Sequence, residues 1–360
     1  MKRVVVIFVF IIALLPPLMA QPPKYSNEFL AIGVGARALG MSNANVAIVN
    51  DVTSSYWNPA GLSLLSHDWQ VAGMHSEYFA GIAKYDYMGV ATKIDENTTA
   101  GFSIIRFGVD DIPNTTELIG SDGRFHYDMI TTFSAVDYAF LFSISGKSSV
   151  KGLRYGGNVK IIYRRIGDFA RAYGFGFDLG VQYDLKKWKF GAVGKDITST
   201  FNAWSFDISE KMKDVFISTN NDIPENSLEV TLPRFILGVG REFDLGKGFS
   251  SIANIDFDVT FDGERNVLIK SDPISVDPRI GLEFGYKHFV FLRAGAGNIQ
   301  NQIEFGGKTT TSFQPNIGVG IVIKNLVSID YALTDLGDQS IALYSNVFSL
   351  KFNFNRKTSL

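Results

Sequence analysis

The hydrophobic residues of this chain alternate with small and polar residues over long stretches. Between Tyr173 and Leu185 every odd-numbered position carries a large apolar side chain, and every even-numbered position is Gly, Asp or Gln. The end of the chain repeats the pattern over 348–354, where Phe and Leu alternate with Ser, Lys and Asn. Because successive side chains of a β-strand point to opposite faces, each stretch predicts a strand with one apolar face and one small or polar face.

The length of the alternating stretches points to a membrane. Strands of soluble proteins average about 5–6 residues. Strands that cross a bilayer need about 9–11 residues, with the apolar face toward lipid and the other face toward a lumen. The pattern therefore predicts an all-β fold, an antiparallel transmembrane β-barrel of the outer membrane.

About fourteen runs after residue 66 have the character of strands, an even number of the kind that bacterial barrels use. The predicted strands span 69–76, 83–94, 100–107, 128–144, 153–166, 172–185, 188–196, 234–245, 251–261, 279–286, 290–299, 314–323, 327–333 and 339–354. We therefore assign 67–360 to the barrel.

Short and long connections alternate between these strands, as 186–187 and 197–233 illustrate. Bacterial barrels have short periplasmic turns and longer external loops. The alternation therefore places the mature N-terminus in the periplasm and makes 197–233 a long external loop.

The first residues have the features of an export signal. Lys2 and Arg3 precede an apolar run over 4–15, and Ala20 is a small residue at the expected cleavage site. The apolar run is too short for a spanning helix, which needs about 20 residues. We expect 1–20 to be a cleaved signal peptide.

Composition narrows the chemistry. The chain has no Cys and a formal net charge of −2, so it has no disulfides or thiolate metal sites, and its charge does not suit a nucleic-acid partner. The four His residues show no metal-ligand spacing, and there is no nucleophile elbow or phosphate-binding loop. We expect a protein that is not an enzyme and holds neither metal nor cofactor.

The segment 21–66 differs from the rest of the chain. It is rich in Ala, Gly and Ser and shows no strand alternation. Fourteen strands leave a lumen that needs filling unless it conducts. We expect this segment to form short helices as a plug inside the barrel, approached closely by lumen-facing glycines; the alternative is a helical pair below the barrel on the periplasmic side.

Residues 31–62 resemble the N-terminal signature of the PorV/PorQ family of outer-membrane barrels. The resemblance is carried by Gly-Ala-Arg-Ala-Leu-Gly-Met at 35–41, by Asp51, and by Trp-Asn-Pro-Ala-Gly-Leu at 57–62. The chain departs from the family pattern at Gly35 and Gly61, where the family carries Asp and Lys. The plug motif residues are Arg37, Gly40, Met41, Asp51, Trp57, Asn58, Pro59 and Ala60.

The resemblance implies a non-enzymatic role in type IX secretion. The partners that it implies are a translocon outer-membrane barrel and the C-terminal sorting domains of secreted cargo, which would be passed to surface attachment. The family is also similar to FadL-type barrels, which admit long-chain fatty acids and other hydrophobic compounds. Uptake of such compounds through a gated plug is therefore the alternative function.

The plug residues also have local physical roles. Asn58 before Pro59 is held out of the helical region, so the chain turns sharply there, as a hinge or simply as a return to the first strand. Arg37 and Asp51 need partners inside a barrel, so we expect ion pairs within the plug or with the wall. For Trp57 we expect a packing role or a place in an aromatic girdle before a ligand contact.

The region 197–233 is unusually aromatic for a loop. Loops longer than about 15 residues are usually functional or disordered, and this composition does not suit disorder. Its candidate contacts to a partner or ligand are Phe201, Trp204, Phe206 and Phe216. Simple capping of the barrel mouth is the alternative.

Overall fold

A computed structural model describes residues 27–118, 124–303, 308–336 and 344–356. The predicted signal peptide, its cleavage site and the first part of the predicted strand 339–354 lie outside the described residues.

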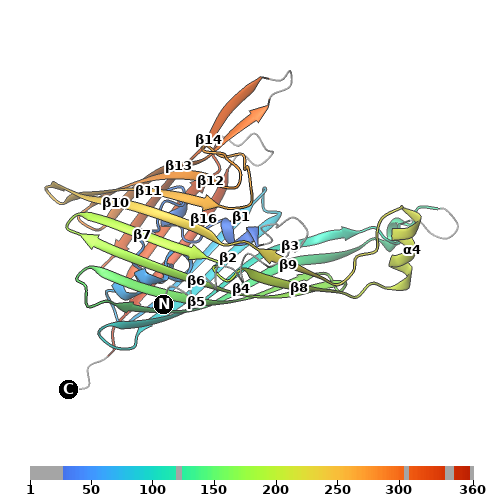
Figure 1. The fold of residues 1–360 in the computed structure, drawn as a ribbon, viewed down its shortest axis with the longest axis horizontal. Helices are drawn as coiled ribbons and strands as arrows, with labels where there is room; N and C mark the ends of the chain where they lie inside the picture. The colour runs from blue at the N-terminus through green and yellow to red at the C-terminus, as the bar shows by residue number, and fades with distance from the viewer. Residues whose placement is uncertain (1–26, 119–123, 304–307, 337–343, 357–360) are drawn as a thin grey trace, which may run out of the picture.

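Fourteen antiparallel strands close into a barrel, which confirms the predicted fold class and strand number (Figure 1). Each strand pairs with its neighbour around the ring, and β16 pairs with β1 to close it. The barrel strands are β1 (Trp69–Tyr78), β2 (Ala83–Lys93), β3 (Thr98–Asn114), β4 (Thr131–Lys147), β5 (Leu153–Ile166), β6 (Ala170–Leu185), β7 (Trp188–Lys195), β10 (Arg234–Gly246), β11 (Phe249–Thr260), β12 (Ser275–Tyr286), β13 (Val290–Ile303), β14 (Thr309–Ile323), β15 (Val327–Thr334) and β16 (Ser345–Phe354).

The outer face of the barrel carries the apolar half of the alternation. In β6 the odd-numbered side chains are mostly exposed on this face, whereas the even-numbered ones face the lumen and are mostly buried. Tyr138, Tyr163 and Tyr173 lie side by side at one level of the outer face. Tyr155 and Trp188 are exposed near the opposite ends of their strands. Aromatic rings at two levels flanking aliphatic side chains are the arrangement expected of a lipid-facing belt.

No helix within the described ranges is long and apolar enough to cross a membrane.

The belt predicts a depth-dependent response to charge. Leu179 lies on the outer face between the two aromatic levels, whereas Leu185 ends the same strand. We expect Leu179→Arg to lower the free energy of unfolding from bilayers by about 2–4 kcal/mol, and Leu185→Arg to lower it by at most about 1 kcal/mol. Urea titration of the refolded protein in lipid vesicles measures both values, and equal costs would contradict the placement of the belt.

The two rims of the barrel differ. At one rim, which we call the short-turn rim, tight turns join β6 to β7, β12 to β13 and β14 to β15. At the other, the long-loop rim, the wall extends unevenly and is tallest over β3, β4 and the region 197–233 (Figure 1). A short helix, η3 (Tyr127–Met129), lies in the connection between β3 and β4.

The region 197–233 contains two strands and a helix. The prediction that it is a loop without secondary structure was therefore wrong. The region forms β8 (Thr200–Phe206), α4 (Glu210–Ser218) and β9 (Ser227–Thr231). β8 pairs with β6 beyond the point where β7 leaves it, so β8 and β9 extend the wall. The break between β7 and β8 contains Asp196 and Ser199, whose φ angles of 53° and 58° turn the chain before it becomes a strand again.

Residues 27–65, which we call the luminal segment, lie inside the barrel (Figure 1). They form the short helices η1 (Glu28–Ala31), α2 (Ala36–Leu39), α3 (Ser54–Trp57) and η2 (Pro59–Leu64). Val34, Val52, Trp57 and Leu62 pack with lumen-facing wall residues such as Ile105 in one hydrophobic cluster. The core of the molecule is therefore the contact between this segment and the wall.

Candidate functional site

The luminal segment rests on glycines of the wall. A Cβ atom on Gly281 would lie 2.7 Å from the Met41 Cβ, and one on Gly156 would lie 2.6 Å from the Pro59 carbonyl carbon. Gly180 and Gly295 approach Asn58 and Met41 just as closely. The wall accepts no side chain at these positions, because backbone and side-chain atoms of the luminal segment already fill the space.

Gly40 makes a similar approach from the luminal side. A Cβ on Gly40 would lie 3.0 Å from the Gly318 Cα, so two backbones meet there without side chains between them. The motif residues Gly40 and Met41 therefore sit against β12, β13 and β14.

Asn58 joins the luminal segment to the wall through its side-chain amide. Its Nδ2 donates to the carbonyl oxygens of Val46, at 3.1 Å, and Val181, at 3.0 Å, while its Oδ1 accepts from Ala60 N–H at 3.2 Å. Asn58 has extended backbone angles and Pro59 begins η2, which is the sharp turn that the sequence predicts. Ala60 is fully buried beside them.

Trp57 anchors the packing of the luminal segment. Its ring is buried and lies edge-on to Tyr56, with ring centroids 4.8 Å apart. Its Nε1 donates to the Val34 carbonyl oxygen at 2.8 Å. Trp57 therefore has the packing role that we expected. The alternative, a place in an aromatic girdle, is wrong because the ring lies inside the barrel.

Arg37 pairs with the wall and not with Asp51. Its Nε and Nη2 donate to the two carboxylate oxygens of Glu283 at 2.8 and 3.0 Å. Arg293 also donates to Glu283, at 2.6 Å, and to Asp330, at 2.6 Å. Glu283 thus holds two guanidinium groups, one from the luminal segment and one from β13.

Asp51 makes the second ion pair to the wall. Its Oδ2 accepts from Lys351 Nζ at 2.7 Å, and its Oδ1 accepts from the Thr53 N–H at 3.0 Å. Burial disfavours the charged carboxylate, but Lys351, the Thr53 hydrogen bonds and the Arg37 charge outweigh it. They lower the pKa of Asp51 well below its ordinary value of 3.8.

This shift fixes how the contribution of Asp51 to the seating of the luminal segment depends on pH. Because the pKa of Asp51 is lower in the seated segment than in a displaced one, the carboxylate stabilises seating at every pH above about 4. That contribution is lost only as the pH falls through the lowered pKa. We expect the mobility of a nitroxide at Asn50→Cys, measured by electron paramagnetic resonance, to stay constant from pH 8 to pH 5. Release near pH 6 that is absent from Asp51→Asn would contradict the pairing.

Two cavities lie on opposite sides of the luminal segment. The long-loop cavity has a volume of about 380 Å³ and touches Leu39, Ser42 and Asn43. The short-turn cavity has a volume of about 660 Å³ and touches Arg37 and Asn50. Residues 37–43, held by the Glu283 ion pair and the wall glycines, therefore separate the two.

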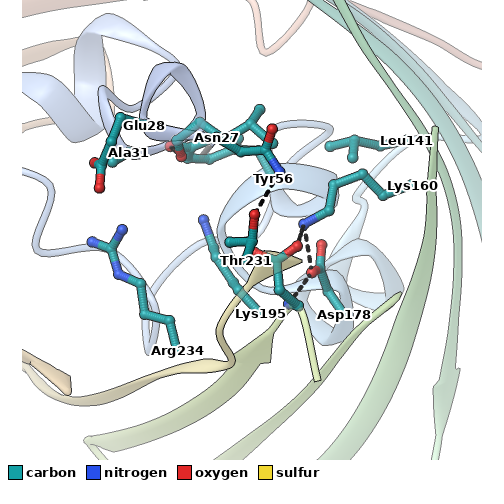
Figure 2. A pocket seen from close by; sticks show the side chains of 12 residues that line it. Asn27, Glu28, Ala31, Tyr56, Leu141, Lys160, Asp178, Lys195, Thr231 and Arg234 are labelled. Atoms are coloured by element: carbon teal, nitrogen blue, oxygen red, sulfur yellow. Dashed lines mark hydrogen bonds and ion pairs between the residues drawn. The ribbon is translucent and has the colours of Figure 1, made fainter. Parts of the chain in front are cut away.

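A third, smaller cavity lies beside η1, where the wall changes from β7 to β8 (Figure 2). Lys160 Nζ contacts Asp178 at 3.0 Å and Asp196 at 2.6 Å, and Lys195 Nζ lies 3.9 Å from the centre of the Tyr56 ring. The volume is only about 30 Å³, which has room for water but not for an organic molecule.

The four candidate aromatic residues of 197–233 lie on different surfaces of the protein. Trp204 is buried on the inner face, where it stacks with Phe206 and lies 5.1 Å below the Arg164 guanidinium. Phe201 is exposed on the outer face of β8, and Phe216 lies half-buried on α4. The structure does not bring these four residues together, and their contacts to a partner or ligand stay predictions.

Sequence reasoning missed the wall partners of the luminal segment. Glu283, Arg293, Asp330 and Lys351 occupy lumen-facing positions of their strands. Charged residues at such positions are a usable signal, because a lumen filled by protein requires each of them to be paired. Within the described ranges, no three His, Asp or Glu side chains gather as metal ligands would.

The fold and its filled lumen define a fourteen-strand transmembrane barrel with an internal N-terminal segment. No protein-family model matches the chain, and a comparison with curated proteins finds no match either. Solved structures do match. The toluene transporter TodX of Pseudomonas putida has 13% identity and a TM-score of 0.57, over 89% of this chain and 98% of that one.

Two further structures show the same likeness. The toluene transporter TbuX of Ralstonia pickettii has 12% identity and a TM-score of 0.54, over 90% of this chain and 99% of that one. A FadL homologue of Pseudomonas aeruginosa has 11% identity and a TM-score of 0.53, over 89% and 98%. At these identities the likeness shows the fold, which is FadL-like over almost the whole of each chain.

Proposed function

We propose that this protein is a gated outer-membrane transporter for hydrophobic small molecules, with the luminal segment as its plug. The observation that carries the proposal is the position of residues 37–43 between two cavities that open toward opposite rims. A molecule that passes from one cavity to the other has to displace this part of the segment. The ion pairs that Arg37 and Asp51 make with the wall would hold the plug in its closed position.

The similar structures support hydrophobic transport more than the secretion role. Those reported above are named as toluene transporters and as a FadL homologue. The proposal includes the orientation that the sequence predicts, with the short-turn rim and the N-terminus in the periplasm. It also includes the prediction that the chain is not an enzyme.

A reversible crosslink tests the gate. The Ala36 backbone N–H donates to Ser349 Oγ at 2.7 Å, so these two residues are in direct contact and are the pair chosen for an engineered disulfide. The native chain has no Cys, so Ala36→Cys/Ser349→Cys would contain one thiol pair. We expect uptake of labelled toluene by cells that carry this variant to stop on oxidation and to return after reduction.

Matched controls separate the possible failures of the test. Each single Cys variant should transport toluene under both conditions, because neither can lock the segment. If the oxidised double variant still transports, the luminal segment is not the gate. If the unmodified protein transports no toluene or other hydrophobic probe, the proposed function itself is wrong.

The type IX role that the N-terminal signature implies is a second candidate. It is favoured by exposed apolar side chains at the long-loop rim, which a protein partner could cover. Tyr127 is 72% exposed there and Ile217 is 65% exposed. Affinity purification from gently solubilised outer membranes, followed by mass spectrometry, tests it. Recovery of a very large barrel or of cargo sorting domains would favour secretion, and recovery of the barrel alone with a bound hydrophobic compound would favour transport.

A further inference from the structure

The long-loop cavity has two chemically different sides. Its wall side is polar and includes Arg279, Gln314, Asn316 and Asp335. Its other side is largely apolar and includes Ile32 and Leu39 of the luminal segment, with Tyr78 at the end of β1 and Phe79 just beyond it. A plain hydrocarbon that filled this space would remove water from the polar side without replacing its hydrogen bonds, which is unfavourable.

The charges of the polar side do not suit an anion. Arg279 donates to Asp277 through Nε at 3.1 Å and to Asp258 through Nη2 at 3.0 Å, so two carboxylates already engage its guanidinium. Asp335 adds another carboxylate to the lining. A carboxylate or phosphate ligand would therefore meet unfavourable negative charge without a free cation.

The same lining is rich in neutral polar groups. Gln314 and Asn316 contribute side-chain amides to it, and Thr334 and Ser345 contribute hydroxyl groups. Groups of this kind form hydrogen bonds with the hydroxyl groups of a ligand without any change of charge. The amide of Gln314 is held in place by its bond to Asp335 Oδ1 at 2.5 Å, and Asn316 Nδ2 donates to Ser42 Oγ at 2.8 Å. The polar side is therefore ordered before any ligand arrives.

We propose that the long-loop cavity binds neutral amphiphiles that have a hydroxyl-rich head, such as alkyl glycosides, in preference to hydrocarbons and fatty-acid anions. The head contacts the side that holds Asp277, Gln314 and Asn316, and the apolar part contacts Ile32, Leu39 and Tyr78. A volume of about 380 Å³ lies within the range of small-molecule sites. This inference names a ligand class for the transport proposed above and rests on entry from the long-loop rim.

Equilibrium binding on the intact protein in lipid nanodiscs tests the ligand class. The probes are n-octyl-β-D-glucoside below its micellar concentration, octanoate, octylammonium and toluene, each measured by calorimetry. We expect one glucoside per chain, bound at least about tenfold more tightly than the other three. Tighter binding of octanoate or toluene would overturn the inference, and so would tighter binding of octylammonium, because the head would then be cationic.

A variant pair locates the site. Gln314→Leu should weaken glucoside binding roughly tenfold and leave toluene binding unchanged or stronger. Thr311→Val is the control, because Thr311 is exposed on the same strand and does not line the cavity. Unchanged glucoside binding in Gln314→Leu would overturn the site. Toluene uptake without preference for the glucoside overturns this inference alone, whereas failure of all uptake overturns the proposed function.

Discussion

Replacing Gly295 with leucine is expected to expel the luminal segment from the lumen while the barrel wall stays folded. A Cβ on this glycine would lie 2.6 Å from Ser42 N and closer still to Met41, and these are backbone atoms that cannot rotate away. The outer face of β13 is unchanged, so the wall strands keep their pairing. We expect a nitroxide at Asn50→Cys to become mobile, and single-channel conductance in planar bilayers to rise from near zero to a stable open level.

Gly73→Leu is the control for placing a leucine on a wall strand. Gly73 alternates with the buried, lumen-facing residues Ala72 and Met74, so it lies on the outer face, and the nearest atom to its Cβ position is the Tyr87 carbonyl oxygen at 3.8 Å. This variant should keep the nitroxide immobile and the channel closed. If Gly295→Leu behaved in the same way as Gly73→Leu, close glycine contact would not be what seats the segment.

Glu283→Ala is expected to have the second large effect. Glu283 accepts hydrogen bonds from both Arg37 and Arg293, so its removal leaves two guanidinium groups facing each other inside the barrel. Breaking a buried ion pair by removing one partner costs about 3–5 kcal/mol. We expect a loss of this order in the free energy of seating, measured by urea titration of the nitroxide signal in vesicles.

Two comparisons make this prediction specific. Arg37→Ala should cost less than Glu283→Ala, because Glu283 then keeps Arg293 as its partner. Glu242→Ala should cost at most about 1 kcal/mol, because Glu242 pairs with Lys189 and is half-exposed at the short-turn rim. A cost for Arg37→Ala equal to or above that of Glu283→Ala would contradict the shared role of the carboxylate.

The barrel could be predicted from the sequence because its signal is periodic. Lipid on one side and lumen on the other impose an alternation of period two, and the described strands match the predicted ranges within a few residues at most ends. The turn at Asn58 and Pro59 was also predictable, since it depends on two adjacent residues. Both features are local in the chain.

The partners of the luminal segment could not be predicted in the same way. Arg37 meets Glu283 and Asp51 meets Lys351, contacts that depend on the closed ring and its register. The interpretation of 197–233 as a loop failed for a related reason. The alternation at 200–206 is short. These residues form a strand because β7 pairs only with residues 179–185 of β6, which leaves residues 170–175 of β6 to pair with β8.

The set of glycines beneath the luminal segment also has a consequence for assembly. The segment is made first, yet its contacts run from Gln70 on β1 to Ser349 on β16, the last strand of the chain. Its final position therefore does not exist until the ring has closed between β1 and β16. A seated luminal segment is thus a marker of completed folding. In a refolding experiment, protection of its amides from hydrogen exchange should appear together with the pairing of β1 and β16, and not before it.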